Sequence, residues 1–143
     1  MEPAQTPTIP SPASALPNAI RTFLEQPRYA TLATIGADGT PHQAVIWYGV
    51  DGDDLLINSR RERRWPSNLL NDPRLSLAVQ DGNEPNHWVG VKGRAELLRD
   101  GPAALADIQA LARRYGDPDG GRFEGQDRVT YRVVVESTFE YGD

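Results

Sequence analysis

The fold is decided by residues 29–59, which read YATLATIGADGTPHQAVIWYGVDGDDLLINS. Three runs rich in Thr, Val, Ile, Leu and aromatic residues, a composition typical of β-strands, are interrupted by two short segments that contain Asp-Gly. Asp-Gly supplies the positive φ that tight hairpin turns require. The stretch therefore predicts an antiparallel meander with strands over Tyr29–Ile35, Thr40–Val50 and Asp54–Ser59.

The rest of the chain adds further strands and a few short helices. Alternating apolar and polar residues predict strands over Arg74–Gln80, Asn86–Leu98 and Arg128–Phe139. Helical spacing of apolar residues predicts helices between Pro17 and Pro27, over Trp65–Asn71 and over Pro102–Tyr115. We therefore expect a mainly β protein of the α+β class, a six-stranded antiparallel β-barrel with short helices.

The length favours one domain preceded by a tail. The chain has 143 residues, the usual size of a single domain. Its first 17 residues hold five of the 12 prolines and few large apolar side chains, so they bury too little to compensate for ordering. We expect residues 1–16 to be a flexible tail and residues 17–143 to form the domain.

Composition excludes several classes of function. Fifteen Lys and Arg against 20 Asp and Glu give a net charge of −5, which argues against a nucleic-acid or anionic-membrane platform. The absence of cysteine excludes disulfides, a thiolate nucleophile and cysteine-ligated metals, and two histidines leave little for a metal site, so no metal is expected. No apolar run reaches the roughly 18 residues of a membrane helix. A cytoplasmic protein with a small-molecule partner is the expectation.

The densest chemical signal is the segment SRRERR at residues 59–64, with a local charge of +3. It follows a predicted strand and precedes a predicted helix, so its side chains and free backbone N–H groups could converge on a phosphate. The alternative is a solvated turn whose arginines pair with Asp51, Asp53 and Asp54. From the residues alone, both interpretations stay open, with the solvated turn favoured.

No arrangement of residues forms a catalytic motif. His42 lies in an alternating strand and is most simply a half-exposed strand residue, although it could act as a proton donor. Trp47, Tyr48 and Trp88 could line a flat aromatic ligand or serve as core and subunit contacts. If the protein is an enzyme, the reactive atoms therefore belong to a cofactor, and no catalytic residue is assigned.

Several short stretches occur in a characteristic order, namely Tyr29–Thr34, Gly39–His42 with the strand through Tyr48, Asn68–Leu77 and Val91–Glu96. Together they resemble the pyridoxamine phosphate oxidase-like flavin-binding split barrels, most closely the small coenzyme F420-dependent oxidoreductases of that superfamily. The resemblance runs from about Pro17 to Phe139. It implies a split barrel that forms a homodimer, with a flavin or deazaflavin between the subunits.

The resemblance also implies a set of cofactor contacts. The ring would run along the Thr40–Tyr48 strand, and the phosphate would meet the arginine-rich segment. Trp88, with His87 and Asn86, would approach the cofactor from the other subunit. The implied residues are His42, Gln43, Ala44, Val45, Ser59, Arg60, Arg61, Arg63, Arg64, Trp65, Asn68 and Trp88. Relatives often carry Lys where Trp65 stands, and Arg64 could replace that charge. We expect Arg60 and Arg64 to contribute most, and Arg61 or Arg63 to point to solvent.

The implied activity is hydride transfer from reduced coenzyme F420 to an unsaturated acceptor such as an enone, quinone or tetrapyrrole. The proton would come from water, or from His42 or Tyr48. The alternatives are an FMN-dependent oxidoreductase or oxidase, a non-catalytic carrier of flavin, deazaflavin or haem, and an interaction barrel that uses the arginines. The loops Asp81–Pro85 and Gly116–Asp127 would supply the substrate side of the pocket.

Overall fold

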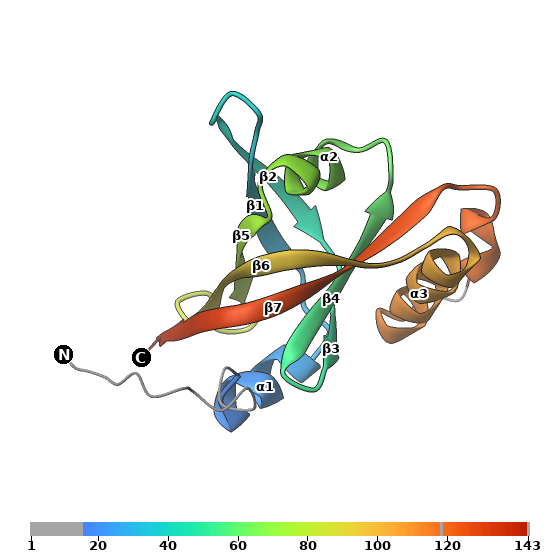
Figure 1. Ribbon diagram of the computed structural model, residues 1–143. Helices are drawn as coiled ribbons and strands as arrows, with labels where there is room; N and C mark the ends of the chain where they lie inside the picture. Colours follow the sequence, from blue (N-terminus) through green and yellow to red (C-terminus); the bar gives the residue numbers. More distant parts are fainter. Residues whose placement is uncertain (1–15, 118, 143) are drawn as a thin grey trace.

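The computed structural model describes residues 16–117 and 119–142. Its elements are α1 (Asn18–Glu25), β1 (Ala30–Ile35), β2 (Pro41–Ile46), β3 (Gly49–Asp51), β4 (Asp54–Arg60), α2 (Arg64–Asn71), β5 (Arg74–Gln80), β6 (Trp88–Asp100), α3 (Gly101–Arg114), the 3₁₀ helix η2 (Gly120–Phe123) and β7 (Arg128–Tyr141). All the strands belong to one antiparallel sheet (Figure 1). The prediction of a mainly β, α+β fold is confirmed.

The two Asp-Gly turns lie where the sequence predicts them. Gly39 has φ 86° in the turn between β1 and β2, and Gly52 has φ 64° between β3 and β4. Both values lie in the left-handed region that glycine adopts without steric cost. The register follows from these turns, with Ile35 opposite Pro41 in one hairpin and Asp51 opposite Asp54 in the other.

The predicted strand count and barrel closure are wrong. The sheet has seven strands in the order β2-β1-β5-β6-β7-β4-β3, and its edge strands β2 and β3 do not pair. They separate at Tyr48, whose backbone N–H donates to the Tyr115 hydroxyl at 3.2 Å and whose carbonyl accepts from Arg114 Nε at 2.9 Å. Because the end of α3 uses these backbone groups, the predicted strand Thr40–Val50 divides into two and the sheet stays unclosed.

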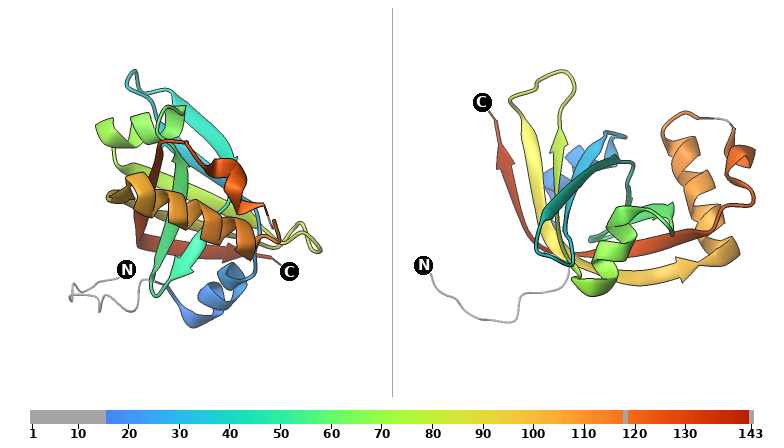
Figure 2. Two further views of the ribbon diagram at one scale, coloured as in Figure 1. Left: turned by 90° about the vertical axis from the view of Figure 1, so that its right-hand side faces the viewer. Right: turned by 90° about the horizontal axis from the view of Figure 1, so that it is seen from above.

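The longest strands, β6 and β7, form the centre of the sheet and connect its two halves (Figure 1). Their pairing shifts register at Lys92/Gly93 and again at Leu97/Arg99. Such irregularities bend a strand and increase its twist. The ends of β6 and β7 nearest α3 therefore diverge in direction from their other ends, as the view from above shows (Figure 2).

Two groups of apolar side chains hold the elements together. The larger joins α1 and α2 to the sheet, and the smaller lies where α3 and η2 cover the side of β4 and β7. The smaller group consists of Ile108, Leu111, Ala112 and Phe123, with Trp47 and Leu105 packed against it. Within the described residues, no helix is long and apolar enough to cross a membrane.

The last residue of the predicted tail packs into the core. Leu16, placed by the sequence in the tail, is 1% exposed and belongs to the larger core group. A single leucine without periodic apolar neighbours gave no signal of this burial. The remainder of the predicted tail, residues 1–15, lies outside the described residues.

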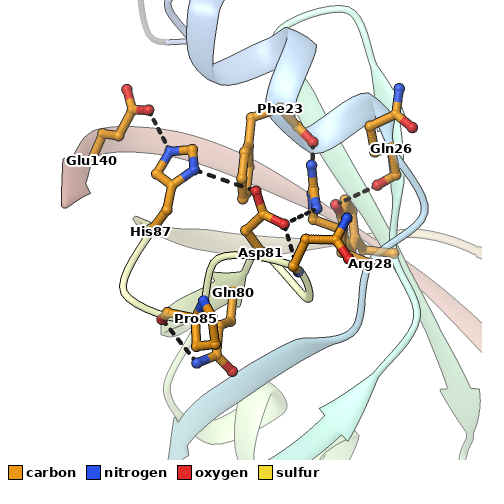
Figure 3. A network of polar contacts seen from close by, with 10 residues as sticks. Phe23, Gln26, Arg28, Gln80, Asp81, Pro85, His87 and Glu140 are labelled. Atoms are coloured by element: carbon orange, nitrogen blue, oxygen red, sulfur yellow. Dashed lines mark hydrogen bonds and ion pairs between the residues drawn. The ribbon is translucent and has the colours of Figure 1, made fainter. Parts of the chain in front are cut away.

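A histidine joins three parts of the fold at the end of β7 (Figure 3). His87 Nε2 lies 2.7 Å from Glu140 Oε2, and His87 Nδ1 lies 3.5 Å from Asp81 Oδ2. The imidazole also packs edge-on against the Phe23 ring of α1 at 4.8 Å. Arg28 completes the network through Asp81 at 3.3 Å. When it is protonated, His87 thus stabilises contacts among α1, the β5–β6 turn and β7.

We expect the stability of this corner to fall as the pH rises. The hydrogen bond to Glu140 raises the pKa of His87 above its ordinary value, and Asp81 adds to the effect. A raised pKa contributes stability that is complete below the unfolded value and is lost as the pH rises through the folded value. Thermal unfolding between roughly pH 6 and 9 should therefore show a decline in the wild type that His87→Gln flattens. Parallel pH profiles for the two proteins would contradict this role.

Candidate functional site

A cavity of about 360 Å³ opens between the edge of the sheet and the α3–η2 cover. The ends of β2 and β4, the start of α2, the start of β7, and α3 with η2 contribute its walls. Its lining residues are Tyr29, Val45, Ile46, Trp47, Asn58, Ser59, Arg63, Trp65, Ile108, Phe123 and Arg128. One wall is aromatic and aliphatic and another carries two guanidinium groups, a combination suited to a ring system with an anionic group.

Local structure explains how the polar wall forms. Ser59 is buried at the end of β4, and α2 begins five residues later at Arg64. Trp65 is 3% exposed and lies against Tyr131, so the start of α2 is packed on β7. The turn between the two elements is thereby fixed, and Arg63 lines the cavity from it.

The arginine-rich segment does not pair with the aspartates that the solvated-turn interpretation named. Asp53 forms an ion pair with Arg21, and Asp54 forms one with Arg132. Arg61 instead binds Asp127 through Nε at 2.9 Å and approaches Asp100 at 3.4 Å. That interpretation is therefore wrong in its choice of partners, and Arg61 is the arginine of the segment most engaged with protein carboxylates.

The other three arginines differ in their surroundings. Arg60 contacts Glu62 at 2.6 Å, but its Nε is buried and has no hydrogen-bond partner. The Arg63 side chain has no ion pair or hydrogen bond within the described part of the chain, although it lines the cavity. Arg64 is exposed, does not line the cavity, and lowers the pKa of Asp38 as a lesser influence beside hydrogen bonds from Thr40.

Positive charge accumulates beside the cavity. Arg60 is directly opposite Arg128 in the β4–β7 pairing. Burial, and after it the neighbouring charges of Arg63 and Arg60, lower the pKa of Arg128 to about 10. Glu62 is the nearby group that opposes them. Three guanidinium groups and one carboxylate thus lie near one another, and the excess positive charge favours an anionic ligand.

Of the ring contacts on β2 that the resemblance implies, only one lines the cavity. Val45 lines the cavity and is 72% exposed, whereas His42, Gln43 and Ala44 do not line it. The alternative proton donor Tyr48 is excluded from the cavity, since it is 0% exposed and its hydroxyl donates to Leu24 O at 2.8 Å. Burial raises the pKa of Tyr48, which further disfavours proton transfer.

Asn68 and Trp88 lie away from the cavity. Asn68 is buried in α2 and donates through Nδ2 to Thr34 Oγ1 at 3.0 Å, which connects the helix to β1. Trp88 begins β6 and packs against Phe139 and Tyr141 at centroid distances of 5.1 and 6.1 Å. A contact between Trp88 and this cavity would therefore have to come from a second copy.

Removing the Asn68 amide should destabilise the fold. Asn68→Ala leaves the buried Thr34 hydroxyl without its donor, which costs about 1–3 kcal/mol in the free energy of unfolding. Asn71→Ala, at an exposed position of the same helix, is the matched control and should change it little. Chemical denaturation of the three proteins checks this, and equal losses in both variants would contradict the structural role.

The comparisons place the chain in a family. The model of the family described as pyridoxamine 5'-phosphate oxidase matches residues 16–143. The chain belongs to the pyridoxamine 5'-phosphate oxidase family. A pyridoxine/pyridoxamine 5'-phosphate oxidase from Cupriavidus metallidurans is 32% identical over 127 residues, which covers 83% of this chain and 55% of that protein. The chain spans about half the length of the curated relatives it matches.

Solved structures of this split-barrel family are similar in shape. A structure described as an F420 reductase is 28% identical, covers 86% of this chain and 98% of its own, and has a TM-score of 0.73. The heme storage protein HutZ from Vibrio cholerae is 21% identical over 89% of this chain and 95% of its own, with a TM-score of 0.70. At that identity the likeness to HutZ shows the fold alone. Membership in the pyridoxamine 5'-phosphate oxidase family is consistent with flavin-related oxidoreductase chemistry.

Sequence reasoning missed two polar residues of the cavity, Asn58 and Arg128, and the apolar cover from Ile108 and Phe123. Arg128 begins a strand whose apolar alternation starts at Val129, so the alternation gives no signal that Arg128 is buried. Only the pairing of β4 with β7 brings it opposite Arg60. Of the two loops expected on the substrate side, the later one supplies Phe123, whereas Asp81 belongs to the His87 network.

Proposed function

We propose that this member of the pyridoxamine 5'-phosphate oxidase family binds coenzyme F420 in the described cavity and uses it to reduce an unsaturated small molecule such as an enone, quinone or tetrapyrrole. The observation that carries the proposal is the excess positive charge of Arg60, Arg63 and Arg128 beside an aromatic wall. Coenzyme F420 combines a flat deazaflavin ring with a phosphate and a long acidic tail, so it suits both walls.

The residues present fit a phosphorylated ring system. Arg63 and Arg128 line the cavity, and Arg60, which does not line it, adds positive charge from its position opposite Arg128. Ser59 and Arg63 both line the cavity. The F420 reductase with a TM-score of 0.73 and 28% identity supports the same cofactor class. FMN is the second candidate, because the curated relatives are named pyridoxine/pyridoxamine 5'-phosphate oxidases.

Reduced coenzyme F420, when bound, supplies a hydride for the acceptor. The side chains of the cavity bind the cofactor and orient its ring. Trp47, held by stacking on Tyr115 at 5.0 Å and 11°, gives a rigid flat surface for a ring. Ile108 and Phe123 exclude water from the side of α3 and η2. No side chain of the cavity is assigned as an acid, and water provides the proton.

We also propose that two copies form a dimer that completes the site. Trp88, Phe139 and Tyr141 form an aromatic cluster on one face, in which Tyr141 is 61% exposed and Phe139 is 44% exposed. Such clusters on a small domain mark contact surfaces. Light scattering at micromolar concentration should give twice the chain mass of 15.8 kDa, and a mass of one chain with cofactor present would contradict the proposal.

Turnover tests the function. Under anaerobic conditions, the protein should accelerate oxidation of reduced coenzyme F420 by a quinone or enone acceptor, measured by the return of deazaflavin absorbance. Reduced FMN in the same assay separates the two candidate cofactors. Tight binding of either cofactor without acceleration for any acceptor would indicate a carrier and contradict the proposed reaction.

A further inference from the structure

Arg128 stands apart from every other charged residue described. It is 7% exposed, and among residues 16–117 and 119–142 it is the only charged side chain that is buried. It opens β7 at the inner wall of the cavity. Burying a guanidinium away from water is costly unless an opposite charge lies beside it.

The protein supplies Arg128 with neutral partners only. Its Nε donates to Asn58 Oδ1 at 2.9 Å, and a terminal nitrogen donates to Gln126 Oε1 at 2.9 Å. Asp127, the preceding residue, binds Arg61, and Glu62 contacts Arg60. Within the described part of the chain, no carboxylate forms an ion pair with Arg128.

These neutral contacts also orient the side chain. Asn58 is itself held, because its Nδ2 donates to Ala104 O at 2.9 Å and to Thr130 Oγ1 at 2.8 Å. The Phe123 ring lies 5.4 Å from the guanidinium carbon. With two N–H groups fixed by protein oxygens, the remaining donors of the guanidinium are preorganised for a ligand in the cavity it lines.

We infer that Arg128 is the principal ligand of the cofactor's anionic group, assisted by Arg63 at the cavity and Arg60 across the β4–β7 pair. This rests on the proposed function and deepens it. A phosphate or carboxylate would supply the counter-charge that Arg128 lacks, and its affinity would come from a desolvated, hydrogen-bonded pair. Arg61, tied to Asp127, has no share in this site.

The inference is tested by measuring dissociation constants for FMN, for coenzyme F420 and for riboflavin, which carries the flavin ring without phosphate. Arg128→Ala should weaken FMN and coenzyme F420 roughly ten- to a hundredfold and leave riboflavin unchanged. Arg132→Ala is the matched control on the same strand, since Arg132 pairs with Asp54 outside the cavity, and it should bind all three like the wild type.

A second variant tests the charge without removing the side chain. In Gln126→Glu, a carboxylate replaces the amide whose oxygen lies 2.9 Å from Arg128. The protein itself then supplies the negative charge that the ligand would otherwise bring. Affinity for FMN and coenzyme F420 should fall while the melting temperature is kept or raised. This variant stays informative if Arg128→Ala fails to fold. Wild-type affinity for both cofactors in either folded variant would overturn the inference and leave the proposed function standing.

Failure of the proposed function gives a different result. In that case the wild type binds neither FMN nor coenzyme F420, and inorganic phosphate becomes the probe. Phosphate should then raise the melting temperature of the wild type and of Arg132→Ala more than that of Arg128→Ala. Equal shifts, or no shift in the wild type, would overturn the assignment of Arg128.

Discussion

Replacing both Arg60 and Arg63 by Ala is expected to weaken binding of coenzyme F420 by roughly a hundredfold or more. Each guanidinium that donates to a phosphate or carboxylate contributes about 1.5–3 kcal/mol. Arg63 lines the cavity, and the buried Nε of Arg60 has no acceptor in the protein. Isothermal titration with coenzyme F420 at low and high salt measures the loss, which should shrink as salt screens the exposed part of the contact.

The same experiment also tests which arginines of the segment contribute most to cofactor affinity. The sequence favours Arg60 with Arg64, whereas the cavity is lined by Arg63 and not by Arg64. Arg64→Ala is therefore the matched single variant for Arg63→Ala, and it should have the smaller effect. Unchanged affinity in the double variant would show that the arginine-rich segment is a solvated turn and would remove the main support for the site.

Gly93→Ala is expected to lower the free energy of unfolding by about 3 kcal/mol or more. A Cβ at this position would lie 2.3 Å from Val134 O and 3.1 Å from Val134 C, atoms of the paired strand that cannot move without breaking the β6–β7 pairing. The position also coincides with the register shift at Lys92/Gly93. Urea denaturation should show a large fall in the midpoint.

Gly82→Ala is the control for that substitution. A Cβ there would have no neighbour within 4 Å, so the stability should change by less than about 1 kcal/mol. A similar loss in both variants would mean that the close approach of β6 and β7 at Gly93 does not explain the effect. Wild-type stability of Gly93→Ala would contradict the observed pairing.

Much of the fold could be predicted from local chemistry. The Asp-Gly turns at Gly39 and Gly52 and the alternating strands follow from residues that are close in the chain. The division of β2 from β3 could not, because it depends on Arg114 and Tyr115 bonding the backbone of Tyr48. A contact between residues that are distant in the chain leaves no periodic pattern in the sequence around either residue.

The same distinction applies to the site. The charge density of residues 59–64 left an anion site open, the family resemblance favoured it, and Ser59, Arg63, Trp65 and Val45 do meet at one cavity. The individual roles depend on partners elsewhere: Asp127 engages Arg61, while the β4–β7 register brings Arg128 opposite Arg60. Charge could therefore be predicted from composition, but the choice among arginines required the sheet topology.

The central claim is that this cavity holds a phosphorylated deazaflavin. Its most direct test is titration of the purified wild-type protein with coenzyme F420 and with FMN at the same ionic strength. We predict that both bind and that coenzyme F420 binds more tightly, because its acidic tail adds anionic groups for the excess positive charge. Equal or tighter binding of FMN would contradict the deazaflavin assignment, and failure of both cofactors to bind would contradict the site.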